Sequence, residues 1–575
     1  MSPTSTSGSA ATDNYGCLTG PLPPPTWLEI FEAVDKKVIC PQHPYLFQMF
    51  PSALEYKMEE NCLTANVFAP DTKETDLSVV VYIHGGAFQI GMGHMFVHDS
   101  LLNSGKIIVV NFNYRLGPHG FLCLGTEDAP GNAGMKDQVA ALRWVKRNIA
   151  AFGGNPDDVT VAGYSAGATS VELLLASPST RGLFNKMILE SGSGVAVWAV
   201  QRDPLETAKT YAQSLGFDSD GDIQDLEDFF THLPIDTLQS EYSFTEMRDS
   251  TFYFAPCVER EEAKDPFLVD DPANIFKNGE YDKLPMLTGF ADMEGILRLS
   301  SFEQWKDDMN ANFHDFLPAD LRFADDDERR KVAQEIKEFY FGDSPINTDT
   351  VVGYVNYFSD VMFVYPTYRS VSLQAAAGSE NLYLYVYAFV NNRTSTSYPH
   401  VTGARHCSHM KVLGYNIFFI YRDTETHNLK KMKQLLPDVW KNFIITGNYS
   451  TRYGFTVRQV IPDAQINLRK MSLREAAALI YALRSSNGSR ISFEGKNLPG
   501  LQSWGKPTPE GSYAAKVLGE WLPTSPARPR HALFNASSEL RAALWPGRMA
   551  LWDRVYSEHY RAPVPPPSSR KTSDF

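Results

Sequence analysis

Residues 159–176 read VTVAGYSAGATSVELLLA and predict a strand, a sharp turn and a helix in immediate succession. The β-branched start favours a strand, and the Ala- and Leu-rich end favours a helix. Gly163 and Gly167 flank Ser165 and have no Cβ, which lets the backbone pass closely at the turn. A serine held there exposes its hydroxyl at the helix N-terminus, as in a nucleophile elbow. Gly-x-Ser-x-Gly alone also fits an ordinary turn, so the strand before it and the helix after it decide the interpretation.

The segments around this stretch predict a sheet that helices cover. Several short runs rich in Val and Ile are apolar on both faces, which is typical of buried, mostly parallel strands. The predicted strands are residues 78–83, 106–111, 158–163, 186–190, 284–288 and 382–389. Residues 134–150 place Val139, Leu142, Val145 and Ile149 on one helical face, which predicts a crossover helix. The sequence therefore predicts an α/β fold with a mostly parallel central sheet flanked by helices.

The composition fits one large domain with loose ends. The 575 residues are 43% hydrophobic and 21% charged, as in globular proteins. Polar and Pro-rich composition predicts disordered tails at residues 1–20 and 563–575, and residues 21–562 form the single domain between them. Residues 203–351 are richer in acidic residues and helical periodicity, so we expect them to flank the sheet.

Charge and hydropathy argue against two classes of partner. The chain has 53 Lys and Arg against 67 Asp and Glu, a net charge of −14, so we expect no nucleic-acid binding. No apolar run approaches the roughly 18 residues that cross a bilayer, so we expect no transmembrane segment. The sequence carries no signal for an oligomeric state.

A second predicted strand ends in residues suited to an oxyanion hole. A serine hydroxyl needs a base to take its proton, and the oxyanion that its attack creates needs preorganised donors. Residues 79–83 run into His84-Gly85-Gly86, where the two glycines could aim backbone N–H groups into a cavity. With the amide of Ala166, those of Gly85 and Gly86 form the predicted oxyanion hole. The alternative for the glycines is an ordinary strand-ending turn.

Several motifs occur in one order along the chain, and together they resemble a known family. They are Glu60-Asn61-Cys62-Leu63, Asn113-Tyr114-Arg115-Leu116-Gly117, Gly131-Asn132-Ala133-Gly134 with Asp137-Gln138, Phe152-Gly153-Gly154-Asn155-Pro156, the serine elbow, and Glu190-Ser191-Gly192-Ser193. Over residues 21–450, and more weakly at 548–552, the chain is similar to the carboxylesterase/cholinesterase family, the type-B carboxylesterases. It most resembles insect esterases such as juvenile hormone esterase and antennal esterases. The resemblance implies an α/β-hydrolase fold and the hydrolysis of carboxylic esters.

The resemblance also implies the partners of Ser165. The family pattern Gly-x-x-x-Asp-Glu-Gly is similar to residues 289–295 and places the triad acid on Glu294, with Asp292 as the rival carboxylate. The family pattern Gly-x-x-His matches residues 403–406 and places the base on His406, with His409 as the alternative. Ser165, Glu294 and His406 then follow in α/β-hydrolase order.

Other positions match the family or depart from it. Ser191 matches a serine close to the family's triad, and Arg115 with Asp158 resembles a structural salt bridge. Tyr164 stands where the family usually has Glu and juvenile hormone esterases have Gln, so that hormone is not the implied substrate. Family members have further strands before the segment that matches residues 21–27, and only a short polar tail precedes it here. We therefore expect a sheet without those N-terminal strands.

The leading hypothesis is a serine esterase that hydrolyses a small-molecule carboxylic ester through an acyl-enzyme intermediate. No cofactor or metal motif is present in the sequence. The segment Asp218-x-Asp220-x-Asp222 lacks the glycine and the glutamate of a calcium loop, so we expect its acidic residues to cap a helix. One alternative is a catalytically silent adhesion or binding protein on the same scaffold, similar to neuroligin or neurotactin. Another is a truncated esterase that does not turn over.

The signals for cell compartment conflict. Cys40 and Cys62 flank a short segment and could close a disulfide, with two buried thiols as the alternative. Asn-x-Ser/Thr triplets for glycosylation begin at Asn392, Asn448, Asn487 and Asn535. Residues 1–20 contain no basic and apolar signal-peptide pattern. The family resemblance implies a secreted protein, and a cytoplasmic one is the alternative.

Overall fold

The computed structural model describes residues 4–5, 18–23, 37–49, 53, 55–218, 221–239, 247–391, 396–416, 425–448 and 512–566. Most of the two predicted tails lies outside these residues. The division into a domain at 21–562 and two disordered ends therefore stays a prediction.

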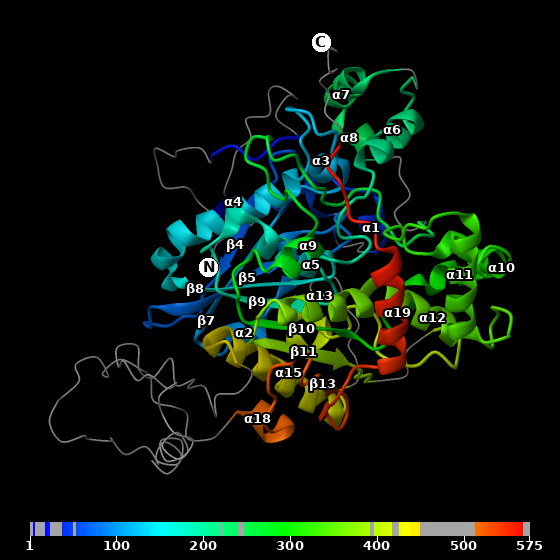
Figure 1. The fold of residues 1–575 in the computed structure, drawn as a ribbon. Coiled ribbons are helices and arrows are strands. Elements are labelled where there is room, and N and C mark those ends of the chain that lie inside the picture. Colours follow the sequence, from blue (N-terminus) through cyan, green and yellow to red (C-terminus); the bar gives the residue numbers. More distant parts are fainter. Residues whose placement is uncertain are drawn as a thin grey trace, which may run out of the picture.

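A ten-stranded sheet forms the centre of the molecule (Figure 1). In order across the sheet, its strands are β1 (Thr4–Ser5), β4 (Thr64–Phe68), β7 (Ile107–Phe112), β5 (Leu77–Ile83), β8 (Gly154–Tyr164), β9 (Lys186–Glu190), β10 (Met286–Ala291), β11 (Leu382–Tyr387), β13 (His531–Phe534) and β14 (Glu539–Arg541). The strands from β7 to β13 pair in parallel, and the outer pairs are antiparallel. The predicted mostly parallel sheet is confirmed.

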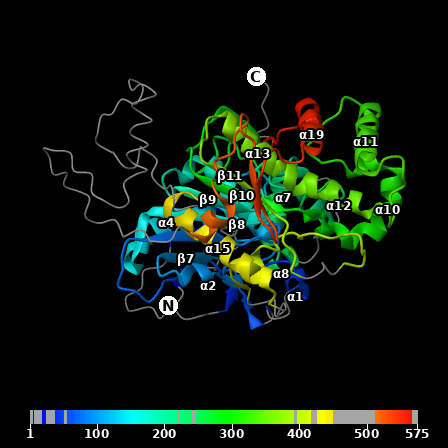
Figure 2. The ribbon, with the colours of Figure 1, turned by 90° about the horizontal axis from the view of Figure 1, so that it is seen from below.

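Alternate strand residues face two separate apolar cores. On β5, Val79 and Val81 join one core, whereas Val80 and Tyr82 join the other. The helices α4 (Ala133–Asn148), α5 (Ala166–Ala176) and α13 (Tyr365–Ala376) cover the first face. The helices α2 (Asp99–Leu102) and α15 (His427–Thr446) cover the second, and Figure 2 shows α15 in front of the strands. Burial on both faces explains why these strands read as continuous apolar runs.

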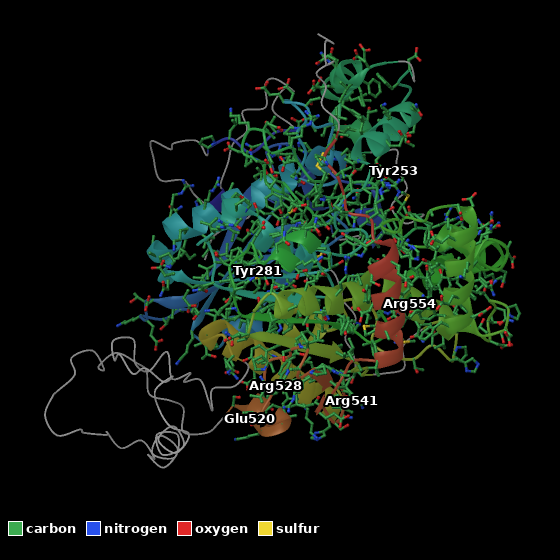
Figure 3. The ribbon with its side chains drawn as sticks, in the orientation of Figure 1. Tyr253, Tyr281, Glu520, Arg528, Arg541 and Arg554 are labelled. Carbon is green, nitrogen blue, oxygen red and sulfur yellow. A yellow bond between two sulfur atoms is a disulfide. The ribbon has the colours of Figure 1, made fainter. Side chains whose placement is uncertain are left out.

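The acidic region predicted to flank the sheet is helical. Its helices are α6 (Pro204–Ser214), α7 (Ile223–His232), α8 (Ile235–Leu238), α9 (Pro272–Asn278), α10 (Phe302–Ala311) and α11 (Asp326–Phe341), followed by α12 (Val351–Ser359). In Figure 1, α10, α11 and α12 gather at one end of the molecule beside the C-terminal α19 (Pro546–His559). Arg554 of α19, labelled in Figure 3, forms an ion pair with Glu335 of α11.

Short elements complete the described parts of the chain. They are β2 (Val38–Ile39), α1 (Tyr45–Met49), β3 (Lys57–Met58), β6 (Phe96–Val97), α3 (Gly117–Phe121), α14 (Met410–Leu413), β12 (Tyr415–Asn416) and α18 (Tyr513–Leu518).

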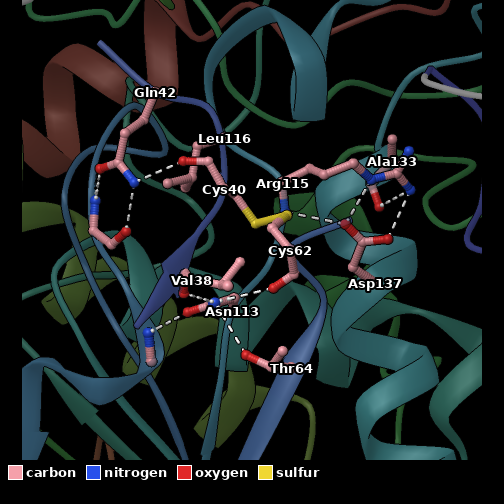
Figure 4. The surroundings of a disulfide bond; sticks show 12 residues. Val38, Cys40, Gln42, Cys62, Thr64, Asn113, Arg115, Leu116, Ala133 and Asp137 are labelled. Atoms are coloured by element: carbon pink, nitrogen blue, oxygen red, sulfur yellow. Dashed lines mark hydrogen bonds and ion pairs between the residues drawn. A yellow bond between two sulfur atoms is a disulfide. The ribbon is translucent and has the colours of Figure 1, made fainter. Parts of the chain in front are cut away.

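The described residues contain two disulfides, one closing a short segment and one joining distant parts of the chain. Figure 4 shows the bond between Cys40 and Cys62, which decides between the two alternatives left by the sequence. Next to it, Asn113 Nδ2 donates to the carbonyl oxygens of Val38 and Cys62, both at 3.0 Å. The second disulfide joins Cys123 to Cys257, across 134 residues, and the sequence analysis did not predict it.

The expected salt bridge between Arg115 and Asp158 is wrong. Arg115 instead forms a bidentate pair with Asp137 of α4, with Nε–Oδ2 at 2.8 Å and Nη2–Oδ1 at 2.7 Å (Figure 4). Asp158 accepts a hydrogen bond from Ser78 and pairs with Lys186. Arg115 follows the carboxyl end of β7, whereas Asp158 lies in the amino-terminal half of β8, directly before the continuous pairing that begins at Val159. Because these strands run parallel, the two residues lie at opposite edges of the sheet.

Replacing Asp137 by Asn should destabilise the protein strongly, because the Arg115 guanidinium, buried with it, would lose its charged partner. Removing one member of a buried ion pair costs about 3–5 kcal/mol. Asp308→Asn breaks the exposed pair between Arg248 and Asp308 and is the matched control, with an expected cost below about 1 kcal/mol. Thermal unfolding followed by circular dichroism measures both variants, and equal shifts in melting temperature would contradict the assignment.

Candidate active site

Ser165 lies at the strand-to-helix turn that the sequence predicted. β8 ends at Tyr164 and α5 begins at Ala166, while Ser165 itself has φ 53° and ψ −126°. A residue with a side chain holds this left-handed backbone only where its surroundings impose it. Gly163 is part of those surroundings, because a Cβ there would lie 2.5 Å from the carbonyl of Gly167. The Ser165 amide donates to the carbonyl of Glu190 at 2.7 Å, which fixes the turn to β9.

The structure brings Ser165, His406 and Glu294 together. His406 Nε2 lies 3.0 Å from Ser165 Oγ, and His406 Nδ1 lies 2.5 Å from Glu294 Oε2. Glu294 is fully buried at the start of the 3-10 helix η6 (Glu294–Ser301), directly after β10. Its second oxygen, Oε1, accepts a hydrogen bond from the Ala291 amide at 2.7 Å. The imidazole is therefore held between a buried carboxylate and the serine hydroxyl.

The two rival residues have other partners. Asp292 Oδ1 accepts a hydrogen bond from the Ala404 amide at 2.7 Å and so supports the turn that precedes His406. Burial raises the pKa of Asp292 to about 6, against the lowering effect of that hydrogen bond. His409 is fully buried, and its Nε2 lies 3.1 Å from Glu190 Oε2.

A ring that the sequence analysis missed packs on His406. The centroid of Phe363 lies 4.4 Å from that of the imidazole, with the ring planes 36° apart. Phe363 sits on a π-helical turn, η8 (Asp360–Val364), and such turns are frequent at functional sites. Trp198 packs on Phe363 and donates to the Met362 carbonyl at 2.8 Å. In the sequence, residues 351–366 read as an ordinary apolar helix, which gives no signal for a π turn.

The predicted oxyanion donors lie in a strained loop beside the elbow. A Cβ on Gly85 would lie 2.6 Å from the Tyr164 carbonyl oxygen and 2.9 Å from Ser165 Cβ, so this loop touches the elbow directly. Gly86 has φ 116°, and the next two residues, Ala87 and Phe88, have φ 56° and 63°. Burial raises the pKa of the Tyr164 phenol, and a hydrogen bond from the Gly85 amide opposes that rise.

Ser191 directly follows β9, and its hydroxyl lies close to Cys407 in the loop that carries His406. Its amide donates to the Gly289 carbonyl at 2.7 Å, and its φ of 55° is left-handed. Burial raises the pKa of the neighbouring Cys407 thiol, and the Ser191 hydroxyl opposes that rise. Its predicted place near the triad stays a prediction.

Two absences among the described residues bear on other kinds of site. They contain no group of three or more His, Cys, Asp or Glu placed to hold a metal ion. They also contain no helix of the length and apolarity that a membrane span requires. Asp222 accepts hydrogen bonds from the amides of Gln224 and Asp225 and caps α7, the helix-capping role predicted for this acidic segment.

Comparison with known proteins gives one consistent family. The model of the carboxylesterase family matches residues 19–472. Esterase FE4 of Myzus persicae is 32% identical over 447 residues, which cover 74% of this chain and 77% of that protein. A juvenile hormone esterase of Heliothis virescens is 32% identical over 448 residues, with 74% and 77% covered. The crystal structure of juvenile hormone esterase from Manduca sexta superposes with a TM-score of 0.73 at 21% identity and covers 96% of this chain and 97% of that one. This last likeness shows the α/β-hydrolase fold.

The raised pKa of Asp292 predicts a pH-dependent stability. The folded state holds the proton to about pH 6, whereas an exposed aspartate loses it near pH 4. The contribution of this group to stability is therefore present below about pH 4 and is lost as the pH rises to about 6. Asp292→Asn keeps an oxygen for the Ala404 amide and cannot ionise. Above pH 6 it should be more stable than the wild type by about 1–3 kcal/mol.

Thermal unfolding between pH 4 and 8 measures this difference. The gap in melting temperature between Asp292→Asn and the wild type should open as the pH rises. A gap that is constant across the range would show that Asp292 does not titrate in it.

Proposed function

The chain belongs to the carboxylesterase family and is a carboxylic ester hydrolase, and we propose that it acts through a Ser165–His406–Glu294 triad and an acyl-enzyme intermediate. One observation carries the proposal. The His406 imidazole has Ser165 Oγ at 3.0 Å on one nitrogen and the buried Glu294 carboxylate at 2.5 Å on the other. This is the arrangement that lets an imidazole take a hydroxyl proton while a carboxylate orients the ring.

In the first half-reaction, Ser165 Oγ attacks the ester carbonyl carbon and His406 Nε2 takes its proton. The bond forms as the carbonyl π electrons move to oxygen, which gives a tetrahedral oxyanion. When that oxyanion collapses, the bond to the alkoxy group breaks and His406 returns the proton to the leaving alcohol. Glu294 accepts the hydrogen bond of the imidazolium and stabilises its charge.

In the second half-reaction, water replaces the serine hydroxyl as the nucleophile. His406 takes a proton from water, the hydroxide attacks the acyl carbon, and a second oxyanion forms. Its collapse breaks the bond to Ser165 Oγ, which receives the proton from His406, and the carboxylic acid leaves. The enzyme returns to its starting state without any cofactor in either step.

For the oxyanion we propose the amides of Gly86, Ala87 and Ala166. The amide of Ala166 is the first of α5 and has no acceptor within its own helix. Gly86 and Ala87 are consecutive residues with positive φ, a backbone form whose amides can line an anion-binding concavity. The sequence analysis named Gly85 in this place, and we propose Ala87 instead because it continues the positive-φ backbone of Gly86.

The rings around His406 support an ester with an apolar part. Phe363 lies against the imidazole, Trp198 packs on Phe363, and Phe252 packs on Trp198 with ring centroids 5.2 Å apart. Such a wall favours an apolar group bound beside the scissile bond. We therefore propose carboxylic esters of apolar or small alcohols as the substrate class.

We also propose that the protein is secreted and glycosylated. Cys40–Cys62 and Cys123–Cys257 support an oxidising compartment, since disulfides are rare in the cytosol. Asn448 and Asn535 are each half-buried and accessible in part to a glycan. The other two triplets, at Asn392 and Asn487, lie outside the described residues.

Substitution of the triad tests the mechanism. With p-nitrophenyl acetate, Ser165→Ala and His406→Ala should each lower kcat by about a millionfold, because nucleophile and base act as one unit. Glu294→Gln should lower kcat by about ten-thousandfold, because the amide no longer stabilises the imidazolium.

Asp292→Asn is the matched control for Glu294→Gln and should keep most of the wild-type rate. Hydrolysis that survives Ser165→Ala would refute the mechanism. A folded wild-type protein without any esterase activity would favour the silent binding protein or the inactive esterase.

Peptide mapping tests the compartment. Protein secreted from insect cells should yield Cys40–Cys62 and Cys123–Cys257 as linked peptides under non-reducing conditions. Cys407, which forms no disulfide, serves as the internal control for free thiol. Enzymatic deglycosylation should convert Asn448 or Asn535 to Asp. Free thiols at all four bridged positions, with every triplet unmodified, would contradict the proposal.

A further inference from the structure

A second carboxylate–histidine pair lies between the elbow and the loop that carries His406. Glu190 is the last residue of β9, and His409 directly precedes α14. Both side chains are fully buried, and Glu190 Oε2 lies 3.1 Å from His409 Nε2, at ion-pair distance without the alignment of a hydrogen bond. We propose that Glu190 and His409 are a positioning pair that holds His406 within hydrogen-bonding distance of Ser165. This inference rests on the triad proposed above.

The backbone of Glu190 is fixed to the nucleophile. Its carbonyl accepts the hydrogen bond of the Ser165 amide at 2.7 Å, and the next amide, that of Ser191, donates to the Gly289 carbonyl at 2.7 Å. The side chain is fixed as well, because Glu190 Oε1 accepts a hydrogen bond from the Tyr385 hydroxyl at 3.3 Å. The position of the Glu190 carboxylate is therefore tied to that of the elbow.

His409 is joined to His406 by a tight turn. The Ser408 amide donates to the Arg405 carbonyl at 3.0 Å, and the Met410 amide donates to the Cys407 carbonyl at 3.1 Å. Cys407, between the two histidines, has φ 57° and so fixes the direction of the chain. A displacement of the His409 side chain is therefore passed to His406 rather than absorbed by the loop.

Most of the groups that face the pair carry no formal charge of their own. Tyr385 and Tyr387 approach the pair from β11, and Tyr82 approaches it from β5. Cys407 approaches it from the loop that carries His406. Burial raises the pKa of Tyr82, Tyr385 and Cys407, so these three groups are uncharged at neutral pH. Glu294 is the other carboxylate nearby, and His406 is its partner.

Loss of Glu190 or His409 should therefore move the loop that carries His406. Burial raises the pKa of Glu190, and the His409 imidazole, 3.1 Å from its carboxylate, opposes that rise. A buried charge without its partner draws in water or shifts its surroundings. Here the surroundings include the turn with His406, whose distance from Ser165 Oγ decides proton transfer.

The test uses three variants of the full chain with p-nitrophenyl acetate as the substrate. His409→Gln and Glu190→Gln should each lower kcat by about a hundredfold with KM nearly unchanged, because a shift of about 1 Å in the base weakens only the transition state. The exchange variant, Glu190→His with His409→Glu, should recover most of that loss. The Tyr385 hydroxyl can donate to an imidazole nitrogen as it does to a carboxylate.

Glu172→Gln is the matched control. Glu172 is another fully buried carboxylate, on α5, and it accepts hydrogen bonds from Ser193, Gly194, Ser370 and Gln374. Its substitution should lower the melting temperature and leave kcat per active site unchanged. Active sites are counted in every variant by titration with an irreversible organophosphate.

The outcomes separate this inference from the mechanism. Wild-type kcat in both single variants, together with inactive Ser165→Ala, would refute the positioning pair and leave the triad intact. Activity retained by Ser165→Ala would refute the triad itself. If the single variants are recovered only as unfolded protein, the exchange variant decides. A folded exchange variant with wild-type KM and most of the wild-type kcat supports the pair, and a folded exchange variant with kcat lowered a hundredfold overturns it.

Discussion

The left-handed backbone of Ser165 is the constraint on which the active site depends. A residue with a side chain reaches this conformation only if its neighbours enforce it. Here the enforcement comes from glycines on both sides, which allow contacts that a Cβ would block, and from the hydrogen bond to Glu190. Those contacts exist because β8 lies between β5 and β9 in a buried parallel sheet. The large apolar core therefore serves to hold one short turn, and with it one hydroxyl.

Parallel pairing also explains how residues far apart in the sequence meet. The carboxyl ends of neighbouring parallel strands lie along one edge of the sheet, where loops can converge. Ser165 follows β8, Glu294 follows β10, and the loop with the proposed oxyanion donors follows β5. His406 is on a longer loop after β11, and the Asp292 carboxylate ties this loop down through the Ala404 amide. The opposite edge carries Asp158 and Lys186, which have no access to the site.

The sequence predicted what depends on local pattern and on order along the chain. The strands and the elbow fall in this class, because hydrophobic periodicity and glycine positions are visible in one dimension. Glu294 and His406 were named only by the family resemblance, and the structure places both beside each other and next to Ser165. The Arg115–Asp137 pair and the Cys123–Cys257 bond depend on which ends of elements meet in space, so no local pattern indicates them. Phe363 was missed because a π turn changes the direction of a ring without changing the apolar pattern. The positive φ of Ala87, which makes its amide a candidate oxyanion donor beside that of Gly86, arises in the folded loop and is not visible in the sequence.

Two Glu–His pairs now stand within one site, and their surroundings give them different roles. The Glu294–His406 pair has an imidazole whose side chain is 13% exposed and whose free nitrogen meets Ser165 Oγ. The Glu190–His409 pair is 0% exposed on both sides. Chemistry at the carbonyl requires a base that substrate and water can reach, which only His406 satisfies. A fully buried pair can act on the reaction only through position, so in our proposal the same two residue types supply a base in one place and a fixed support in the other.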